Sequence, residues 1–205
     1  HILPLPELTP EGDRVNIISF RDSDPTKLSC EHYCMMLLMG LQIRLKEDYN
    51  LSEIYIIDYT KFSLGHVCKY SFPTLKKMEI CSMQGFKLRI KAVLLFEIPA
   101  VVEFLLTWCK SIFKSKIMSR FHYLHGDLNK LHKQVPKRIL PEEYGGEAGK
   151  HEVLSGAWIQ KLESYNQWFS EHEKLKSDES KRHGGKFNTG DLFGFEGAFR
   201  KLELD

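Results

Sequence analysis

The sequence lacks the long apolar run that a membrane-spanning helix requires. Its most hydrophobic region, residues 92–113, is interrupted by Glu97, Pro99, Glu103 and Lys110, whereas a span needs about 20 mostly apolar residues. We therefore expect a protein that touches membranes without crossing them. No apolar leader follows His1, and because the first residue is not Met, we expect the amino terminus to be incomplete.

The sequence also lacks a strong charge imbalance and paired cysteines. A net charge of +2 is too small for general affinity for nucleic acid, so no nucleic-acid partner is expected and anion binding must come from local clustering. The cysteines form an odd set without CxxC spacing, which favours reduced thiols in a cytoplasmic protein. They are Cys30, Cys34, Cys68, Cys81 and Cys109.

Common catalytic and metal-binding motifs are missing. The chain contains no GxSxG, no GxxxxGK[ST], no GxGxxG after an expected strand and no HExxH. Two sets of residues could be considered as metal ligands, but neither has zinc-ligand spacing, so we expect no metal, no cofactor and no enzyme. The two sets are His122, His125 and His132, and Cys30, His32 and Cys34.

A dispersed catalytic site stays open as an alternative. It would have to be assembled from Asp58, His66, Glu97 and the histidines. Asp58 closes an expected strand, where an aspartate can bind a metal or substrate, although capping the following loop is the commoner role.

Strands and helices are expected to alternate along the chain. Strands are expected at 15–20, 54–58, 86–96 and 121–124, after an extended lead-in at 1–12. Helices are expected at about 29–46, 64–82, from Pro99 onward, at 127–134, and from Ser155 through Phe169. Crossovers of this length allow parallel pairing and predict an α/β fold. Residues 135–149 break all periodicity and are expected to form a packed terminal loop.

The first expected helix is apolar nearly all round at its centre. Met35, Met36 and Met39 lie there among leucines. Either this is a core helix under a sheet, or the deformable methionines line a cavity that has no fixed protein partner.

Residues 86–120 are the stretch on which the rest depends. Lys87, Arg89 and Lys91 share one parity of an expected strand, which becomes fully apolar at 92–96. The helix that follows Pro99 carries more hydrophobic surface than one core-facing stripe requires, so apolar material should lie on both sides of it. Its apolar residues include Val101, Val102, Leu105, Trp108 and Phe113.

Cations flank this helix on both sides. Arg89 and Lys91 lie two residues apart on a strand, and Lys116 and Arg120 lie one turn apart on a helix. A solvated surface explains either pair alone. Their placement beside one hydrophobic helix favours a site for phosphorylated lipid head groups.

Several strings resemble a known family. The strand and helix just described, the string KIMSRFHYLHG at 116–126 and above all ILPEEYGG at 139–146 resemble the CRAL-TRIO lipid-binding domains, in the branch of retinaldehyde-binding and α-tocopherol transfer proteins. The tail GFEGAFRKLELD at 194–205 is similar to tails of insect members.

The resemblance implies an α/β fold with a mixed, mostly parallel sheet and helices on its faces. The sheet would form the floor of a hydrophobic pocket closed by a mobile gate helix, which contains Val101, Val102, Leu105, Trp108 and Phe113. It places the lipid contacts at Cys34, Leu37, Leu41, Cys81, Phe86, Leu88 and Val93. It places phosphoinositide binding at Arg89, Lys91, Lys116 and Arg120.

The chain departs from the family pattern at three points. The helical domain that normally precedes this fold is absent, so residues 1–150 would be the lipid-binding domain, 151–176 an amphipathic helix packed on it, and 177–205 a polar linker and tail. Glu97 and Ser111 replace the usual Asn and Pro near the gate. Leu37 and Leu41 are apolar where the tocopherol carrier has hydroxyls.

The expected function is non-enzymatic binding and intracellular transfer of a small hydrophobic lipid, such as a retinoid or tocopherol. Phosphoinositide-containing membranes would promote its release by binding the cations beside the gate. The protein is expected to be a monomer that associates transiently with intracellular membranes. Two alternatives are a lipid-sensing interaction module that transfers nothing, and an enzyme acting on a hydrophobic small molecule.

Overall fold

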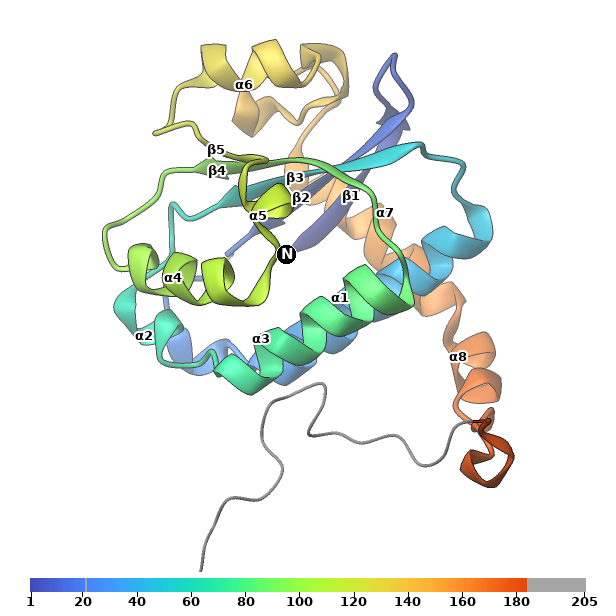
Figure 1. Ribbon diagram of the computed structural model, residues 1–205. Helices are drawn as coiled ribbons and strands as arrows, with labels where there is room; N and C mark the ends of the chain where they lie inside the picture. The colour runs from blue at the N-terminus through green and yellow to red at the C-terminus, as the bar shows by residue number, and fades with distance from the viewer. Residues whose placement is uncertain (21, 184–205) are drawn as a thin grey trace, which may run out of the picture. The chain divides into compact units, whose positions relative to one another are not determined.

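The computed structural model describes residues 1–20 and 22–183, and one sheet of five strands organises it. The strands lie in sequence order, with β1 antiparallel to β2 and all other neighbours parallel (Figure 1). This confirms the mixed, mostly parallel sheet. The strands are β1 Ile2–Leu8, β2 Asp13–Ser19, β3 Ser52–Asp58, β4 Ile90–Phe96 and β5 Phe121–Tyr123.

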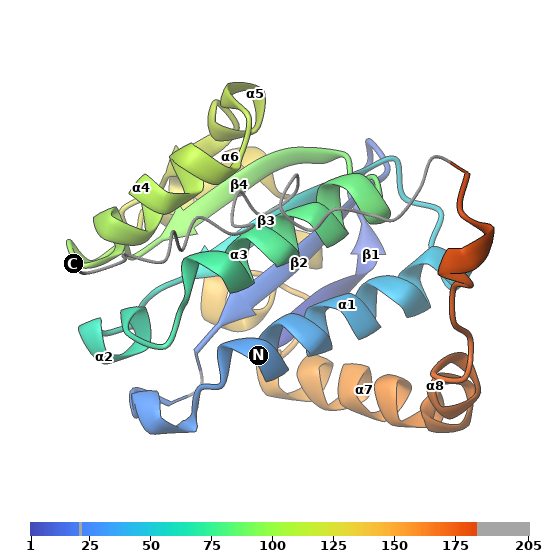
Figure 2. The same cartoon turned by 60° about the horizontal axis from the view of Figure 1, so that its bottom comes forward.

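Helices connect the parallel strands and cover both faces of the sheet. In both views α1, α2, α3 and α4 lie on one face and α6 on the other, while α7 runs beside α1 (Figures 1 and 2). The helices of this part are α1 Cys30–Glu47, α2 Leu64–Val67, α3 Phe72–Glu79, α4 Val102–Ile112, α5 Ser115–Met118, α6 Leu128–Gln134 and α7 His151–Ser164. A π-helical turn, Ile80–Gly85, extends α3.

Two helix starts follow from capping residues, as the sequence predicts. The Ser29 hydroxyl accepts a hydrogen bond from the His32 amide at 3.3 Å, and α1 begins at the next residue. The Asp127 carboxylate accepts hydrogen bonds from the amides of Asn129 and Lys130, and α6 begins after it. Both side chains satisfy amides that have no partner within the helix.

Four parts of the expected element pattern differ from the structure. The lead-in is an edge strand, which tolerates its prolines because one of its sides needs no partner. The helix expected at 64–82 is interrupted, because Ser71 caps a new helix whose first turn contains Pro73. The helix expected from Ser155 begins at His151 and ends at Ser164.

The fourth error concerns the cations around the central strand. This strand begins at Ile90, and Lys87 lies before it in the left-handed region, with φ of 55°. Helix α5 ends at Met118, so Arg120 follows the helix and does not share a face of it with Lys116.

The two faces of the sheet are covered to different degrees. On the α6 side the central-strand residues Ile54 and Ile56 are 2% and 0% exposed. On the α4 side their neighbours Tyr55 and Ile57 are half-buried and pack against a second cluster that includes Leu95 and Val102. One face is therefore sealed, and the other keeps accessible apolar surface at the middle of the sheet.

Residues 135–149 form the packed terminal loop that the sequence predicts. Ile139, Leu140 and Tyr144 are buried in the sealed core. A Cβ at Gly146 would lie 2.0 Å from the Leu140 carbonyl oxygen, so no larger residue fits there. The preceding Gly145 adopts a left-handed conformation, with φ of 65°, that favours glycine.

The described residues from Asn166 onward belong to a second unit, separate from residues 1–165. Within it, α8 spans Asn166–His172, and the Trp168 ring stacks on His172 with centroids 4.1 Å apart. The predicted tail similarity at 194–205, and the part of the predicted linker after residue 183, lie outside the described residues. Among the described residues no helix is both long and apolar enough to cross a membrane.

We expect Leu94→Ala to lower the free energy of unfolding by about 3 kcal/mol, because it leaves a cavity in the sealed core, where Leu94 is fully buried. Leu45→Ala is the matched control, since that side chain is 65% exposed and should change the value by no more than about 0.5 kcal/mol. Urea unfolding monitored by circular dichroism measures both. Equal losses of unfolding free energy in the two variants would contradict the assignment of Leu94 to the core.

Candidate functional site

A basic cavity of about 360 Å³ lies at the amino ends of β2, β3 and β4. Arg89, Lys91 and Arg120 all line it, so the structure brings together three of the four predicted phosphoinositide-binding cations. Lys116 is exposed on α5 and is not among the lining residues. The remaining lining residues are Glu11, Asp13, Leu51, Ser52 and Ile90.

A bulge in β4 helps to place Lys91 in this cavity. Ile90 pairs with Glu53 and Ala92 pairs with Ile54, so Lys91 is an extra residue on its strand. From this position the Lys91 ammonium reaches across β3 to the Asp13 carboxylate on β2 and forms an ion pair with it. The bulge thus places the Lys91 side chain in the cavity. The alternation of side chains along a regular strand does not predict this position.

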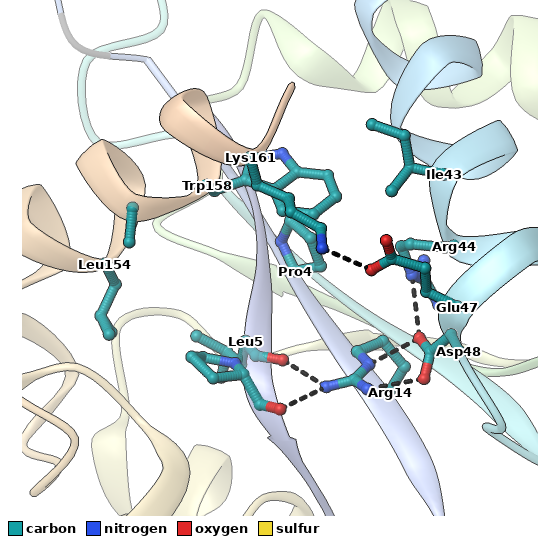
Figure 3. Close-up of a pocket in the computed structure, with 12 residues that line it drawn as sticks. Pro4, Leu5, Arg14, Ile43, Arg44, Glu47, Asp48, Leu154, Trp158 and Lys161 are labelled. Atoms are coloured by element: carbon teal, nitrogen blue, oxygen red, sulfur yellow. Dashed lines mark hydrogen bonds and ion pairs between the residues drawn. The ribbon is translucent and has the colours of Figure 1, made fainter. Parts of the chain in front are cut away.

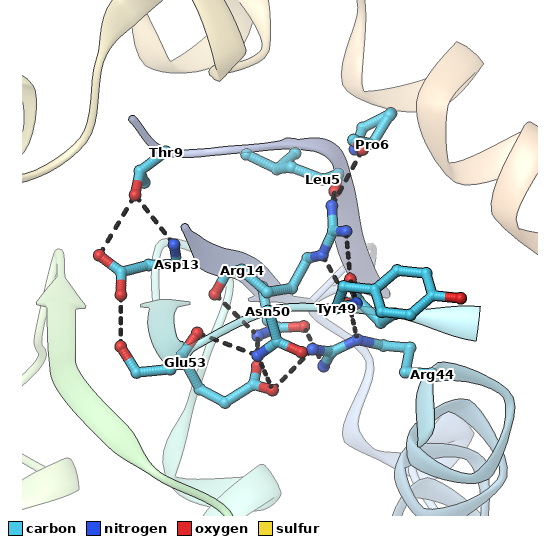
Figure 4. A network of polar contacts seen from close by, with 12 residues as sticks. Leu5, Pro6, Thr9, Asp13, Arg14, Arg44, Tyr49, Asn50 and Glu53 are labelled. Atoms are coloured by element: carbon cyan, nitrogen blue, oxygen red, sulfur yellow. Dashed lines mark hydrogen bonds and ion pairs between the residues drawn. The ribbon is translucent and has the colours of Figure 1, made fainter. Parts of the chain in front are cut away.

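Asp13 is the most tightly held group in the cavity, at 3% exposure. Its Oδ1 accepts a hydrogen bond from the Ser52 hydroxyl, and its Oδ2 accepts one from the Thr9 hydroxyl at 3.2 Å (Figure 4). The same Oδ2 also forms the ion pair with Lys91. Burial raises the pKa of Asp13, but the hydrogen bonds from Lys91 and Ser52 and the charge of Lys91 outweigh this effect. As a result the pKa of Asp13 lies below its usual range, so Asp13 is ionised at neutral pH.

The two arginines of the cavity differ in their freedom. One terminal nitrogen of Arg120 donates a hydrogen bond to the carbonyl oxygen of Ile90. The Arg89 side chain is exposed and has no hydrogen-bond or ion-pair partner within residues 1–20 and 22–183. Arg89 is therefore the cavity cation whose donors are available to an incoming anion.

A buried ionic network fixes the strands next to this cavity. Arg44 of α1 donates hydrogen bonds to Glu53 at 2.6 Å and to Asn16 at 3.0 Å (Figure 4). Arg14 donates to both carboxylate oxygens of Asp48, at 2.8 and 2.6 Å. Breaking a buried pair leaves an uncompensated charge, which is strongly destabilising. The network thus holds α1, β2 and β3 in one arrangement.

The half-buried face of the sheet is the second component of the site. Tyr55, Tyr59 and Tyr70 pack against its cluster, and each side chain remains half-buried. Burial raises the pKa of all three phenols. These side chains are largely surrounded by protein and yet retain part of their accessible surface. No hydrophobic periodicity in the sequence singles out these tyrosines.

The predicted lipid contacts are distributed over this side of the fold. Cys34, Leu41 and Val93 are buried, whereas Leu37, Phe86 and Leu88 are half-buried and Cys81 is exposed on the π-helical turn. Val93 and Leu88 belong to the same cluster as the half-buried sheet residues. Met35 and Met36 of α1 are exposed, so those two methionines do not belong to the core.

The predicted gate residues lie on α4 and at its two ends. Val102 and Leu105 are buried against the sheet, and Val101, Trp108 and Phe113 are half-buried. The Trp108 ring contacts Phe72 at the start of α3, with centroids 6.0 Å apart, and lies 4.8 Å from the ring of Phe104. Phe104 is 55% exposed, so α4 carries apolar surface on its outer side as well.

Two further cavities lie away from these residues. One of about 410 Å³ lies between α1, α7 and β1, with Trp158 at its wall and the Lys161–Glu47 ion pair, 2.7 Å apart, at its rim (Figure 3). Another of about 540 Å³ lies at the carboxyl ends of β2, β3 and β4. There the Tyr144 hydroxyl donates a hydrogen bond to Asp58 at 2.8 Å.

The residues considered for a dispersed catalytic site have separate partners. Asp58 caps its loop by accepting hydrogen bonds from the Thr60 amide and hydroxyl, as the commoner interpretation predicts. His66 is buried and bonds to Ser63, while Glu97 is exposed beside Gly126. Of the metal-ligand candidates, His132 bonds to the Tyr144 carbonyl at 2.8 Å. Within the described residues no three His, Cys, Asp or Glu side chains are grouped closely enough to hold a metal ion.

Residues 1–146 match the CRAL/TRIO domain family. The chain belongs to that family. The match covers the sheet, α1 to α6 and the ILPEEYGG loop, where Gly146 has no space for a side chain.

Among relatives, the mouse "Alpha-tocopherol transfer protein-like" is 38% identical over 111 residues, which are 53% of this chain and 32% of that protein. Rat "Clavesin-1" is 29% identical over 156 residues, 74% of this chain and 43% of that protein. The chain therefore spans less than half of the length of these relatives. The solved structure of Sfh5 aligns with a TM-score of 0.39 and 13% identity over 71% of this chain and 53% of that one, a likeness too weak to relate individual residues.

We expect two fast-reacting thiols at pH 8, those of the exposed Cys68 and Cys81. Cys30 and Cys34 are buried, and burial raises the pKa of Cys109 to about 11, so its reactive thiolate is scarce until the pH approaches that value. Titration with Ellman's reagent counts the fast phase, and Cys68→Ser and Cys81→Ser should each remove one equivalent. A slow reaction of Cys81 with the reagent would show that its thiol lies inside the protein.

Proposed function

We propose that this CRAL/TRIO domain binds a small hydrophobic lipid and transfers it between intracellular membranes, without chemical conversion. The supporting observation is the unequal covering of the sheet: Ile54 and Ile56 are sealed, whereas Tyr55 and Ile57 on the other face stay half-buried. An apolar guest on that face would remove this surface from water. The names of the relatives include a tocopherol transfer protein-like protein, which agrees with a cargo of this type.

The expected driving force is hydrophobic. Each Å² of apolar surface removed from water contributes about 25 cal/mol, so a guest that buries several hundred Å² is held by several kcal/mol before ordering costs. The guest would lie between the sheet and α4, with Trp108 and Val101 at the movable side. Residues 1–150 would form the lipid-binding domain.

The release step is proposed to depend on phosphoinositides. The segment from Phe86 to Lys91 alternates between half-buried apolar residues, Phe86 and Leu88, and exposed cations, Arg89 and Lys91. Leu88 packs against the apolar cluster on the half-buried face of the sheet, while Arg89 lines the basic cavity. Phosphates bound to Arg89 would therefore act on the same segment that contacts the guest. They would favour release of the guest if they bind the open form of the protein better than the closed form.

Replacing Arg89 and Arg120 together with alanine should slow lipid transfer to vesicles that contain phosphatidylinositol bisphosphate, because two cavity cations are lost. Lipid content after purification should be unchanged. The matched control is Lys130→Ala with Lys133→Ala, which removes two exposed cations from α6 on the sealed face. The assay follows a fluorescent lipid from donor to acceptor vesicles.

If the double arginine variant transfers lipid as fast as the unchanged protein, phosphoinositide-triggered release is wrong. If the unchanged protein binds lipid but transfers none, the chain is a lipid-sensing module.

Ile57→Trp should weaken binding of NBD-labelled tocopherol at least about tenfold, because a larger ring would occupy the accessible space on the half-buried face. Ile159→Trp is the control, since Ile159 is 48% exposed on α7. Fluorescence titration measures both, with thermal unfolding as the check of folding. Full binding by a folded Ile57→Trp protein would place the guest elsewhere.

A further inference from the structure

One of the three positive charges of the basic cavity is offset by a fixed carboxylate of the protein itself. Arg89, Lys91 and Arg120 supply three positive charges, and Glu11 and Asp13 supply two negative ones. Glu11 is exposed, and its charge is screened by solvent. Asp13 is buried, so its charge is screened less by solvent.

The position of Asp13 makes this cancellation permanent. Both carboxylate oxygens are occupied, by Ser52 on one side and by Thr9 and Lys91 on the other. Its backbone is also fixed: the Asp13 amide donates to the Thr9 hydroxyl at 3.1 Å, and Asp13 is paired in register with Ser52. The carboxylate cannot turn away when an anion approaches, whereas the Lys91 side chain is 47% exposed and can be reached from solvent.

We infer that Asp13 is an internal counter-anion that limits the affinity of the basic cavity for phosphate. This inference rests on the proposed function and adds an affinity-determining residue to it. A phosphate that contacts Lys91 shares that cation with Asp13 and is repelled by the fixed carboxylate. The Asp13–Lys91 pair contributes little net charge, so Arg89 and Arg120 carry the attraction. Weak binding keeps docking on an anionic membrane reversible.

Asp13→Asn should bind phosphoinositide vesicles about fivefold more tightly, because one fixed negative charge is removed while the side-chain shape is kept. The affinity should also fall more steeply as salt is added. The probe is phosphatidylcholine vesicles with a few per cent phosphatidylinositol bisphosphate, in a sedimentation assay. Glu163→Gln is the control, because it makes the same change in net charge on an exposed position of α7. Inositol trisphosphate in solution forms a second arm, which separates a free phosphate ligand from a membrane head group.

A second variant keeps the test decisive if Asp13→Asn unfolds. Asp13→Asn with Lys91→Gln removes both members of the pair and leaves no unpaired buried charge. Because the pair is self-neutralising, the double variant should bind the vesicles within about twofold of the unchanged protein.

Three results would overturn the inference. In the first, Asp13→Asn binds no more tightly than Glu163→Gln. In the second, the double variant loses several-fold in affinity, which would make Lys91 an active phosphate ligand that Asp13 does not offset. In the third, the unchanged protein binds neither vesicles nor inositol trisphosphate, and the proposed anion site falls together with the inference. The first two leave the proposed function standing, so the failures are distinguishable.

Discussion

The unequal covering of one sheet is the constraint on which the rest of the structure depends. A parallel sheet normally has both faces buried, because its crossover helices pack on them. Here the loop at 135–149, α6 and α7 seal one face around Ile54 and Ile56. The other face has α4 packed over β4, while the middle of the sheet, at Tyr55 and Ile57, stays accessible. The sealed face supplies stability, and under the proposed function the opposite face is left incomplete for a guest.

The ionic network at the amino ends of the strands provides the second half of this arrangement. Arg44 ties α1 to Glu53, and Asp13 ties β2 to Ser52 and to Lys91 of β4. The amino ends of these strands are thereby rigid, although the helices on the half-buried face cover the sheet loosely. The basic cavity lies at this end of the sheet, and the segment from Phe86 to Lys91 connects that end to the half-buried face.

Local chemistry made much of the fold predictable. Ser29 and Asp127 cap their helices through neighbours two or three residues away, and the apolar run at 92–96 has no other place than a buried strand. The features that sequence reasoning missed depend on distant residues. Asp13 and Lys91 are 78 residues apart, and the bulge that brings Lys91 into the cavity is visible only in the pairing of β3 with β4. The prolines of β1 suggested only an extended lead-in and not a paired strand, because its edge position could not be known.

The most direct test of the account is mass spectrometry of an organic-solvent extract of the purified protein. An accessible apolar face inside a folded domain should retain a hydrophobic lipid in near-stoichiometric amount, and adding that lipid back should protect the β3 amides around Tyr55 and Ile57 from hydrogen exchange. An extract without any apolar molecule, together with unchanged exchange when candidate lipids are added, would contradict the account.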